Sequence, residues 1–202
     1  MLTVPGLPFP LRTSQPDVWR LEKRGELVGT APARTDLYVD PSGADLAGTG
    51  STATAPTLLG SPPEGDHRLS ARVTVDFRTT YDAGVLLVHV DERTWAKLCL
   101  ELSPAGTPMI VSVVTRGVSD DANAFVVDGP SVRLRVARVG RVHAFHASTD
   151  GRTWQLIRLF SLGDHAPEVG FEAQSPTGDG CTVTFDEIRY DPGRLADLRD
   201  GT

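Results

Sequence analysis

The chain has 202 residues, of which 40% are hydrophobic and 23% charged, and its formal net charge is −6. This length and apolar content fit one folded domain and exclude a disordered chain. The negative charge argues against binding along nucleic-acid phosphates, which needs a concentrated positive field. The sequence has no apolar run of about 18 residues that could cross a membrane, and its first residues lack a secretory signal. We therefore expect a cytoplasmic protein with neither a nucleic-acid nor a membrane partner.

Short strand-like runs follow one another along nearly the whole chain. Residues 67–77 (HRLSARVTVDF) alternate apolar and polar side chains throughout, which is the period of a half-buried strand. In chain order, we expect strands at 18–23, 26–31, 36–39, 53–59, 67–77, 83–90, 95–102, 108–116, 131–139, 141–148, 153–161, 167–174 and 181–190. The Asp-Gly turn within 149–152 predicts a hairpin, and residues 192–200 are expected to form a turn or two of helix.

The spacing of these strands predicts an all-β fold. Gly, Pro and Asp turns separate the strands at intervals of about 8 to 15 residues, which is typical of a β-sandwich or jelly roll. We expect residues 1–202 to form a single β-sandwich domain, with its core at about 15–191 and short extensions at both ends. The small, polar segment 40–56 is the longest predicted loop, and long loops often border binding sites.

The candidate metal ligands do not have the spacing of a metal site. Both cysteines lie inside predicted strands, where free thiols usually act as small buried hydrophobes. His143 and His146 differ by three positions, so on a strand they point to opposite faces and cannot bind one metal ion together. The acidic segments 40–45 and 119–123 offer oxygen ligands for Ca²⁺, but neither has the D-x-D-x-D-G pattern. We expect no metal and no other cofactor.

The stretch 81–103 (YDAGVLLVHVDERTWAKLCLELS) raises the main functional question, because its second strand carries charges on one face. If residues 91–94 form an even-length turn, Trp95, Lys97 and Glu101 share one face with Cys99, and the leucines of that strand share the other. If 103–108 is also an even-length loop, the next strand places Ser112 and Arg116 beside them. A one-residue slip in register would reverse that last assignment.

The leucine face is the better core, so the mixed face points to solvent or into a groove. A mixed face suits a polar ligand, because an aromatic ring stacks on an apolar patch while charged groups bind hydroxyls or carboxylates. We predict a saccharide-binding groove in which Trp95 stacks on the ligand. The predicted hydrogen-bonding residues are Lys97, Glu101, Ser112, Arg116 and Gln174. The alternative is an outer sheet face whose cross-strand pairs only stabilise the fold.

Several motifs, in this order along the chain, resemble one bacterial and fungal family. They are Tyr81, Asp82 and Gly84; Trp95, Lys97 and Glu101; 113–116 with Ser119 and Asp120; Ser148, Asp150, Gly151 and Trp154; and Ser175 with Pro176. The family is labelled in places "regulation of enolase" and otherwise a domain of unknown function. The resemblance covers about residues 15–191 and implies a concanavalin-A-like jelly roll of two antiparallel sheets, one of them with a concave face. It implies no established activity, and Asp121 departs from a Trp that family members often carry.

Two further functions stay open on the residues alone. A glycoside hydrolase needs two carboxyl groups that flank the scissile bond; Glu101 would be one, and Asp36, Asp82 or Glu172 could supply the other. A regulatory or protein-interaction module, including a homodimer, is the second alternative. Because Glu101 is the only acid on its strand, we expect a binding protein rather than an enzyme.

Overall fold

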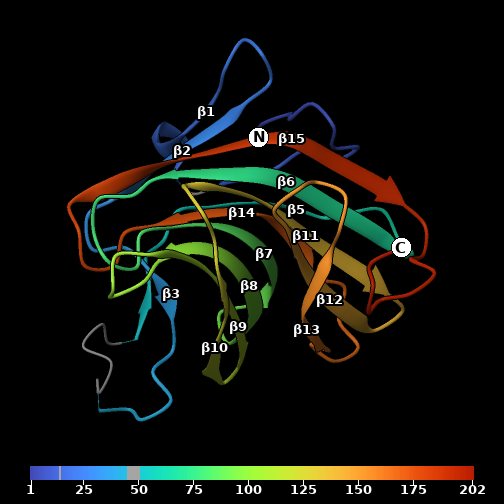
Figure 1. Ribbon diagram of the computed structural model, residues 1–202. Coiled ribbons are helices and arrows are strands. Elements are labelled where there is room, and N and C mark those ends of the chain that lie inside the picture. Colours follow the sequence, from blue (N-terminus) through green and yellow to red (C-terminus); the bar gives the residue numbers. More distant parts are fainter. Residues whose placement is uncertain (14, 45–50) are drawn as a thin grey trace.

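The computed structural model describes residues 1–13, 15–44 and 51–202. Within these residues the chain forms a jelly-roll sandwich of two large antiparallel sheets, as predicted (Figure 1). In spatial order, the larger sheet contains β1 (Trp19–Leu21), β2 (Leu27–Pro32), β15 (Gly180–Pro192), β6 (His67–Asp76), β11 (Ser131–Val139), β12 (Val142–Ser148) and β13 (Gln155–Phe160). The smaller sheet contains β10 (Val118–Val126), β9 (Pro108–Arg116), β8 (Thr94–Leu102), β7 (Ala83–Asp91), β14 (Glu168–Gln174) and β5 (Thr57–Gly60).

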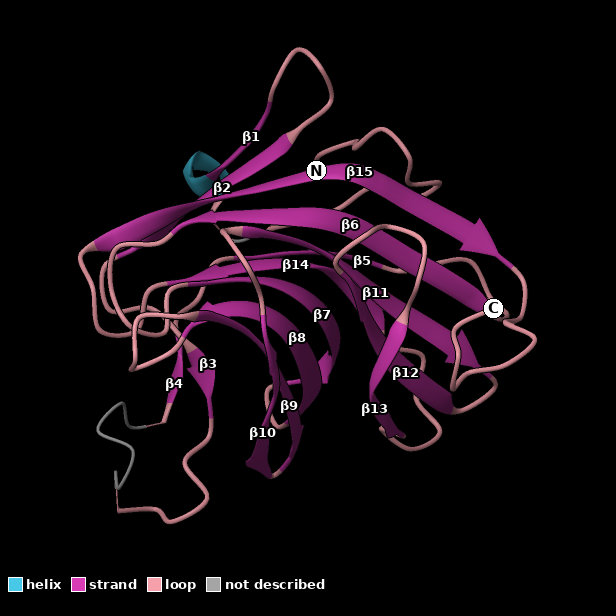
Figure 2. Cartoon of the chain, viewed as in Figure 1, coloured by secondary structure: helices cyan, strands magenta, loops and turns pink. Residues whose placement is uncertain are grey.

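The smaller sheet is the one that forms the candidate site. Figure 2 shows its strands as bent arcs whose concave side faces away from the larger sheet. The short strands β3 (Leu37–Tyr38) and β4 (Thr52–Ala53) pair with each other at the open side of the arc. The concave face therefore has a floor of sheet and a flank supplied by the β3–β4 hairpin.

The main core fills the space between the two sheets, as the strand alternation predicts. Along β6, buried and half-buried side chains alternate, and Leu69, Val73 and Val75 face the smaller sheet. On β8, Leu98 and Leu100 lie in the same core cluster, so the prediction that the leucine face is the inner one is confirmed. Burial of such side chains is the main source of folding free energy, at roughly 1.5–3 kcal/mol for each large one.

The strand registers beside β8 differ from the prediction by one residue. Trp95 pairs with His89, and not with Val90 as an even-length turn at 91–94 implies, because a β-bulge interrupts β7 between His89 and Asp91. On the other side, Lys97 pairs with Val113 because the loop before β9 has five residues, 103–107, and not an even number. Val111 and Val113 therefore share the concave face with Lys97, and the expected even-length loop was wrong.

Three segments differ from the predicted secondary structure. Residues 118–126 form the edge strand β10 although no strand was expected there, because VSDDANAFV lacks an alternating apolar pattern. The predicted strand 53–59 divides into β4 and β5. The tail 192–200 forms bends and turns without the expected helical turn, and a short 3₁₀ helix, Pro16–Val18, precedes β1. No helix in the described ranges is long and apolar enough to cross a membrane.

Candidate functional site

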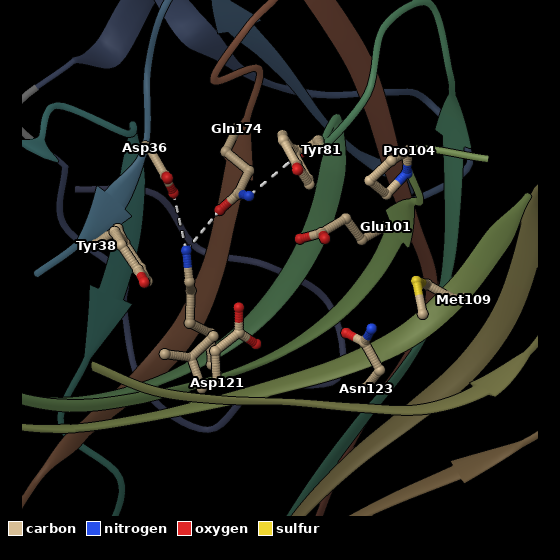
Figure 3. Close-up of a pocket in the computed structure, with 11 residues that line it drawn as sticks. Asp36, Tyr38, Tyr81, Glu101, Pro104, Met109, Asp121, Asn123 and Gln174 are labelled. Atoms are coloured by element: carbon tan, nitrogen blue, oxygen red, sulfur yellow. Dashed lines mark hydrogen bonds and ion pairs between the residues drawn. The ribbon is translucent and has the colours of Figure 1, made fainter. Parts of the chain in front are cut away.

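A pocket of about 260 Å³ opens on the concave face of the smaller sheet (Figure 3). Its polar lining consists of Asp36, Tyr38, Tyr81, Lys97, Glu101, Asp121, Asn123 and Gln174, and its apolar lining of Pro104, Met109 and Val113. These residues come from β3 and the residue before it, from β8, β9, β10 and β14, and from the loops before β7 and after β8. The pocket is thus built from parts of the chain that are far apart in sequence.

Strand pairing explains why these side chains face the same cavity. Paired residues of an antiparallel sheet project from the same side. Lys97 on β8 pairs with Val113 on β9, which pairs with Asp121 on β10. Farther along the same face of β8, two residues after Cys99, Glu101 pairs with Met109. Alternation along β8 and β10 therefore directs the ammonium group and the two carboxyl groups into one concavity.

Lys97 is the centre of a buried polar network. Its Nζ lies 2.9 Å from Asp36 Oδ1 and donates a 2.7 Å hydrogen bond to Gln174 Oε1. Glu172 Oε1 lies 3.8 Å from the same nitrogen. Burial lowers the pKa of Lys97, but the carboxylates of Asp36 and Glu172 outweigh burial and raise that pKa well above its usual value. The raised pKa makes Lys97 a permanent cation, and because the residue is 2% exposed, its donors are directed at protein groups.

The carboxyl groups around Lys97 are more numerous than the cation can neutralise. The pKa of Glu101 is raised to about 8, chiefly by burial and in addition by the negative charges of Asp121, Asp36 and Glu172, against the opposing effect of Lys97. Burial likewise raises the pKa of Glu172 to about 7 and the pKa of Asp121 above its usual value. Glu172 is fully buried, and neither carboxylate oxygen has a hydrogen-bond partner among the described residues.

The rim of the pocket next to Gln174 is held in a strained backbone conformation. Gln174 Nε2 donates a 3.2 Å hydrogen bond to the backbone oxygen of Tyr81. Tyr81 has a φ of 72°, in the left-handed region that side chains other than Gly rarely adopt. The buried carboxylate of Asp82 maintains this turn, because it accepts a backbone hydrogen bond from Thr79 at 2.9 Å and one from the Ser175 hydroxyl at 2.6 Å. Asp82 therefore organises the loop and does not line the pocket.

The structure brings together half of the predicted ligand-binding residues. Lys97, Glu101 and Gln174 all line the pocket. Ser112 and Arg116 do not, because the shifted register places them on the opposite face of β9, with Ile110 and Val114 of the core. Ser112 is buried there, and Arg116 is exposed and donates to the Ser161 carbonyl at 3.3 Å.

Trp95 shares the concave face but is not open to a ligand. It is fully buried in a second apolar cluster, where Leu37 of β3 and Ala55 pack with it. The Lys97 ammonium lies 5.7 Å from the centre of the Trp95 ring, so the indole stabilises the lysine through a cation–π interaction. The expected stacking platform was therefore wrong, because the β3–β4 flank covers the indole.

Four polar residues of the pocket were not predicted as ligand contacts. Tyr38, Tyr81, Asp121 and Asn123 line the cavity beside the expected groups. The alternation of Asp36 with Tyr38 and of Asp121 with Asn123 is the one signal that could have placed each pair on a common face. Residues 119–123, which we considered as a calcium loop, lie within β10, and the other proposed loop extends to Asp45, which lies outside the described residues. Among the residues described, no group of His, Cys, Asp or Glu has the arrangement of a metal site.

The fold and the site define a β-sandwich with a polar pocket on the concave face of one sheet, and the comparisons agree with the fold. Residues 13–193 match the family described as "Protein of unknown function (DUF1349)", and the chain belongs to this family. It is 37% identical over 121 residues to "Regulation of enolase protein 1" of Saccharomyces cerevisiae. That alignment covers 57% of this chain and 59% of the yeast protein's length. The family resemblance predicted from the motifs is confirmed.

Solved structures show the same fold. A functionally unknown protein from Saccharomyces cerevisiae superposes with a TM-score of 0.76 at 24% identity, over 88% of this chain and 96% of that chain. A mutant of the GH43 protein BlXynB from Bacillus licheniformis superposes with a TM-score of 0.72 at 16% identity, over 90% of this chain and 36% of that chain. At these identities the likeness concerns the fold, which is similar to that found in glycoside hydrolases.

Proposed function

We propose that the protein binds a saccharide, or a polyol of similar size, in the concave pocket, without transforming it. The observation that carries the proposal is the lining itself. Acceptor and donor groups of Glu101, Asp121 and Asn123 face a cavity that two tyrosines also line. Hydroxyl-rich rings are recognised by such convergent polar groups together with aromatic faces. Tyr38 and Tyr81 thereby take the role that we first assigned to Trp95.

The size of the cavity supports a small ligand. A volume of about 260 Å³ lies just below the range of roughly 300–1,000 Å³ that is usual for drug-sized ligands. One sugar ring, or the end of a chain, matches this space better than a polymer segment. Lys97 contributes indirectly, since its bonds to Asp36 and Gln174 hold the base of the cavity in place.

Titration calorimetry with a panel of mono- and disaccharides tests the proposal. We expect binding by the wild-type chain and at least about fivefold weaker binding by Asp121→Asn and by Asn123→Ala, since each removes a ligand contact worth about 1 kcal/mol or more. Arg116→Ala is the matched control: Arg116 lies on the neighbouring strand but on the opposite face, so its loss should leave the affinity unchanged. A panel in which no sugar binds, or in which only Arg116→Ala abolishes binding, would contradict the pocket.

One observation favours catalysis as a second candidate function. The pKa of Glu101, raised to about 8 chiefly by burial, keeps this acid protonated at neutral pH, as a general acid of a glycosidase must be. Asp121 is a better partner than the acids considered from sequence, because Asp36 is paired with Lys97 and Asp82 holds the loop. Turnover of chromogenic glycosides that is lost in Glu101→Gln would establish the hydrolase in place of the binding protein.

An interaction module stays a third hypothesis. Sedimentation velocity at several protein concentrations tests the homodimer, since self-association would raise the mean sedimentation coefficient with concentration.

A further inference from the structure

The charges of the concave pocket restrict the ligand that it can hold. Asp36, Glu101, Asp121 and Glu172 surround the site, and in the described structure Lys97 is the cation placed among them. When all five groups are ionised, the carboxylates outnumber the ammonium by three. The positive charge of Arg158 on β13 also acts on Asp121, but this guanidinium pairs with Asp120 at 2.9 Å.

Lys97 is not available to an anionic ligand. Its nitrogen is engaged by Asp36 at 2.9 Å and by Gln174 at 2.7 Å, with Glu172 at 3.8 Å, and the side chain is 2% exposed. A uronate or phosphate entering the cavity would therefore meet carboxyl groups without a free positive partner, which is repulsive.

Two of the carboxyl groups, by contrast, have no ion-pair partner among the described residues. Glu172 is fully buried, neither of its carboxylate oxygens accepts a hydrogen bond within the described chain, and the Lys97 ammonium 3.8 Å away is already engaged by Asp36. Glu101 and Asp121 point into the cavity from β8 and β10 (Figure 3), and no described cation forms an ion pair with either. Glu101 is half-buried and Asp121 is exposed, so a ligand can reach both, and the cost of ionising the half-buried carboxyl falls when an opposite charge arrives.

We propose that the ligand of this pocket carries an ammonium group, as an amino sugar does, and that this group binds between the carboxylates of Glu101 and Asp121. The inference rests on the proposed saccharide site and names the chemical class that it selects. An organic cation fits better than a bare metal ion, because Pro104, Met109 and Val113 give the cavity an apolar wall. The hydroxyls of the ring would be bound by Asn123 and the tyrosines.

A charge series at one carbon of one sugar tests the inference. The three probes are 6-amino-6-deoxyglucose, glucose and glucuronic acid, which are cationic, neutral and anionic at the same position. We expect calorimetry at pH 8 to give an affinity at least about tenfold higher for the amino sugar than for glucose, as one charge-assisted contact provides. Glucuronic acid should bind more weakly than either.

The same probe should reveal proton release. An aliphatic ammonium stays charged to about pH 9, whereas Glu101 must lose its proton to pair with it. The affinity for the amino sugar should therefore rise between pH 6.5 and 8.5, and heats measured in buffers of different ionisation enthalpy should report protons released on binding. The affinity for glucose should change little over this range. Lys97, Asp36, Asp121 and Glu172 face Glu101 and set this titration.

Variants identify the groups responsible. Glu101→Gln keeps the shape and removes the charge, so the amino sugar should fall to the affinity of glucose and the proton release should disappear. Arg116→Ala should change neither. Thermal unfolding of Glu101→Gln verifies that it is folded, and Asp121→Asn provides a second variant with the same expected loss of preference.

The outcomes separate the two proposals. Equal affinity for all three sugars, or tighter binding of glucuronic acid, would overturn the ammonium inference and leave the saccharide site standing. Binding of cyclohexylmethylamine as tightly as the amino sugar, with no binding of glucose, would overturn the saccharide site and leave the ammonium site. If none of the four probes binds, both proposals are wrong.

Discussion

Glu101 is an acid without an ion-pair partner among the described residues, and its ionisation lowers the stability of the fold at alkaline pH. Its pKa of about 8, raised chiefly by burial, exceeds the ordinary glutamate value of about 4.3. The folded state therefore binds this proton more tightly than the unfolded state. The stability that results is complete below about pH 4 and is lost as the pH rises through 8. A loss of stability of this kind is typical of groups retained for function.

Glu101→Gln should therefore stabilise the protein at alkaline pH. Glutamine resembles the protonated acid, so we expect little change in the free energy of unfolding at pH 5 and a gain of about 2–4 kcal/mol at pH 9. Urea denaturation at the two pH values measures the difference, and Glu64→Gln, at an exposed loop position outside the pocket, is the control. A gain of the same size at both pH values would mean that packing, not charge, is responsible.

Lys97 should be needed for folding as much as for binding. Lys97→Met leaves Asp36 and Glu172 buried without their cation, which usually costs about 3–5 kcal/mol. The double variant Lys97→Met, Glu172→Gln should recover part of that loss, because one of the stranded charges is gone. Chemical denaturation of the two single variants and the double variant gives the coupling. A Lys97→Met variant as stable as the wild type would show that the network contributes no net stability.

At the scale of the strand, the alternation of side chains predicted correctly which residues share a face of β8. It did not predict correctly which residues pair across adjacent strands. The face shared by Trp95, Lys97 and Glu101 follows from the period of a strand and needs no tertiary information. Pairing with the adjacent strands depends on the bulge near Val90 and on a five-residue loop, and neither has a signal in composition. One residue of slip was enough to carry Arg116 to the wrong side of the sheet.

The remaining parts of the site depend on contacts across the chain. Asp36 and Tyr38 reach the pocket because the β3–β4 hairpin packs over the concave face. Asp121 and Asn123 reach it because β10 pairs as an edge strand, although most of its residues are exposed. Edge strands carry little of the apolar pattern on which strand prediction relies.

The two sheets approach each other closely at β7, and this approach requires a glycine at position 84. A Cβ at Gly84 would lie 2.5 Å from the Cγ1 atoms of both Val73 and Val183 on the opposite sheet. Gly84→Ala should therefore lower the free energy of unfolding by about 1–3 kcal/mol, as overpacked cores do. Val183→Ala in the same chain should restore part of that loss, although Val183→Ala alone is destabilising. Additive losses in the double variant would show that the two positions do not compete for space.

Across the whole molecule, the stability contributions of the two sheets depend on pH in opposite directions. Burial raises the pKa values of Glu101 and Glu172 to about 8 and about 7, so the smaller sheet loses stability toward alkaline pH. Burial lowers the pKa values of His143 and His146 to about 4, so the larger sheet loses stability toward acid. The free energy of unfolding should be greatest between these limits.

His143 provides the sharpest test of the predicted loss of stability toward acid pH. The imidazole is 2% exposed, stacks on Phe160 at 5.5 Å, and has no hydrogen-bond partner for either ring nitrogen among the described residues. Its folded pKa of about 4, lowered by burial and then by Arg138 and His67, lies below the unfolded value of about 6.5. The unfolded state therefore binds more protons between these values, and stability falls as the pH drops through that window.

His143→Phe should accordingly flatten the acid side of the stability profile. An apolar ring of similar shape cannot take up the proton, so we expect a small change at pH 7.5 and a relative gain of about 2 kcal/mol at pH 5. His165→Gln, at an exposed position, is the matched control and should leave the profile unchanged. Urea denaturation between pH 4.5 and 8 measures the three profiles. Parallel profiles for His143→Phe and wild type would show that this buried ring is not the group that makes the larger sheet sensitive to acid.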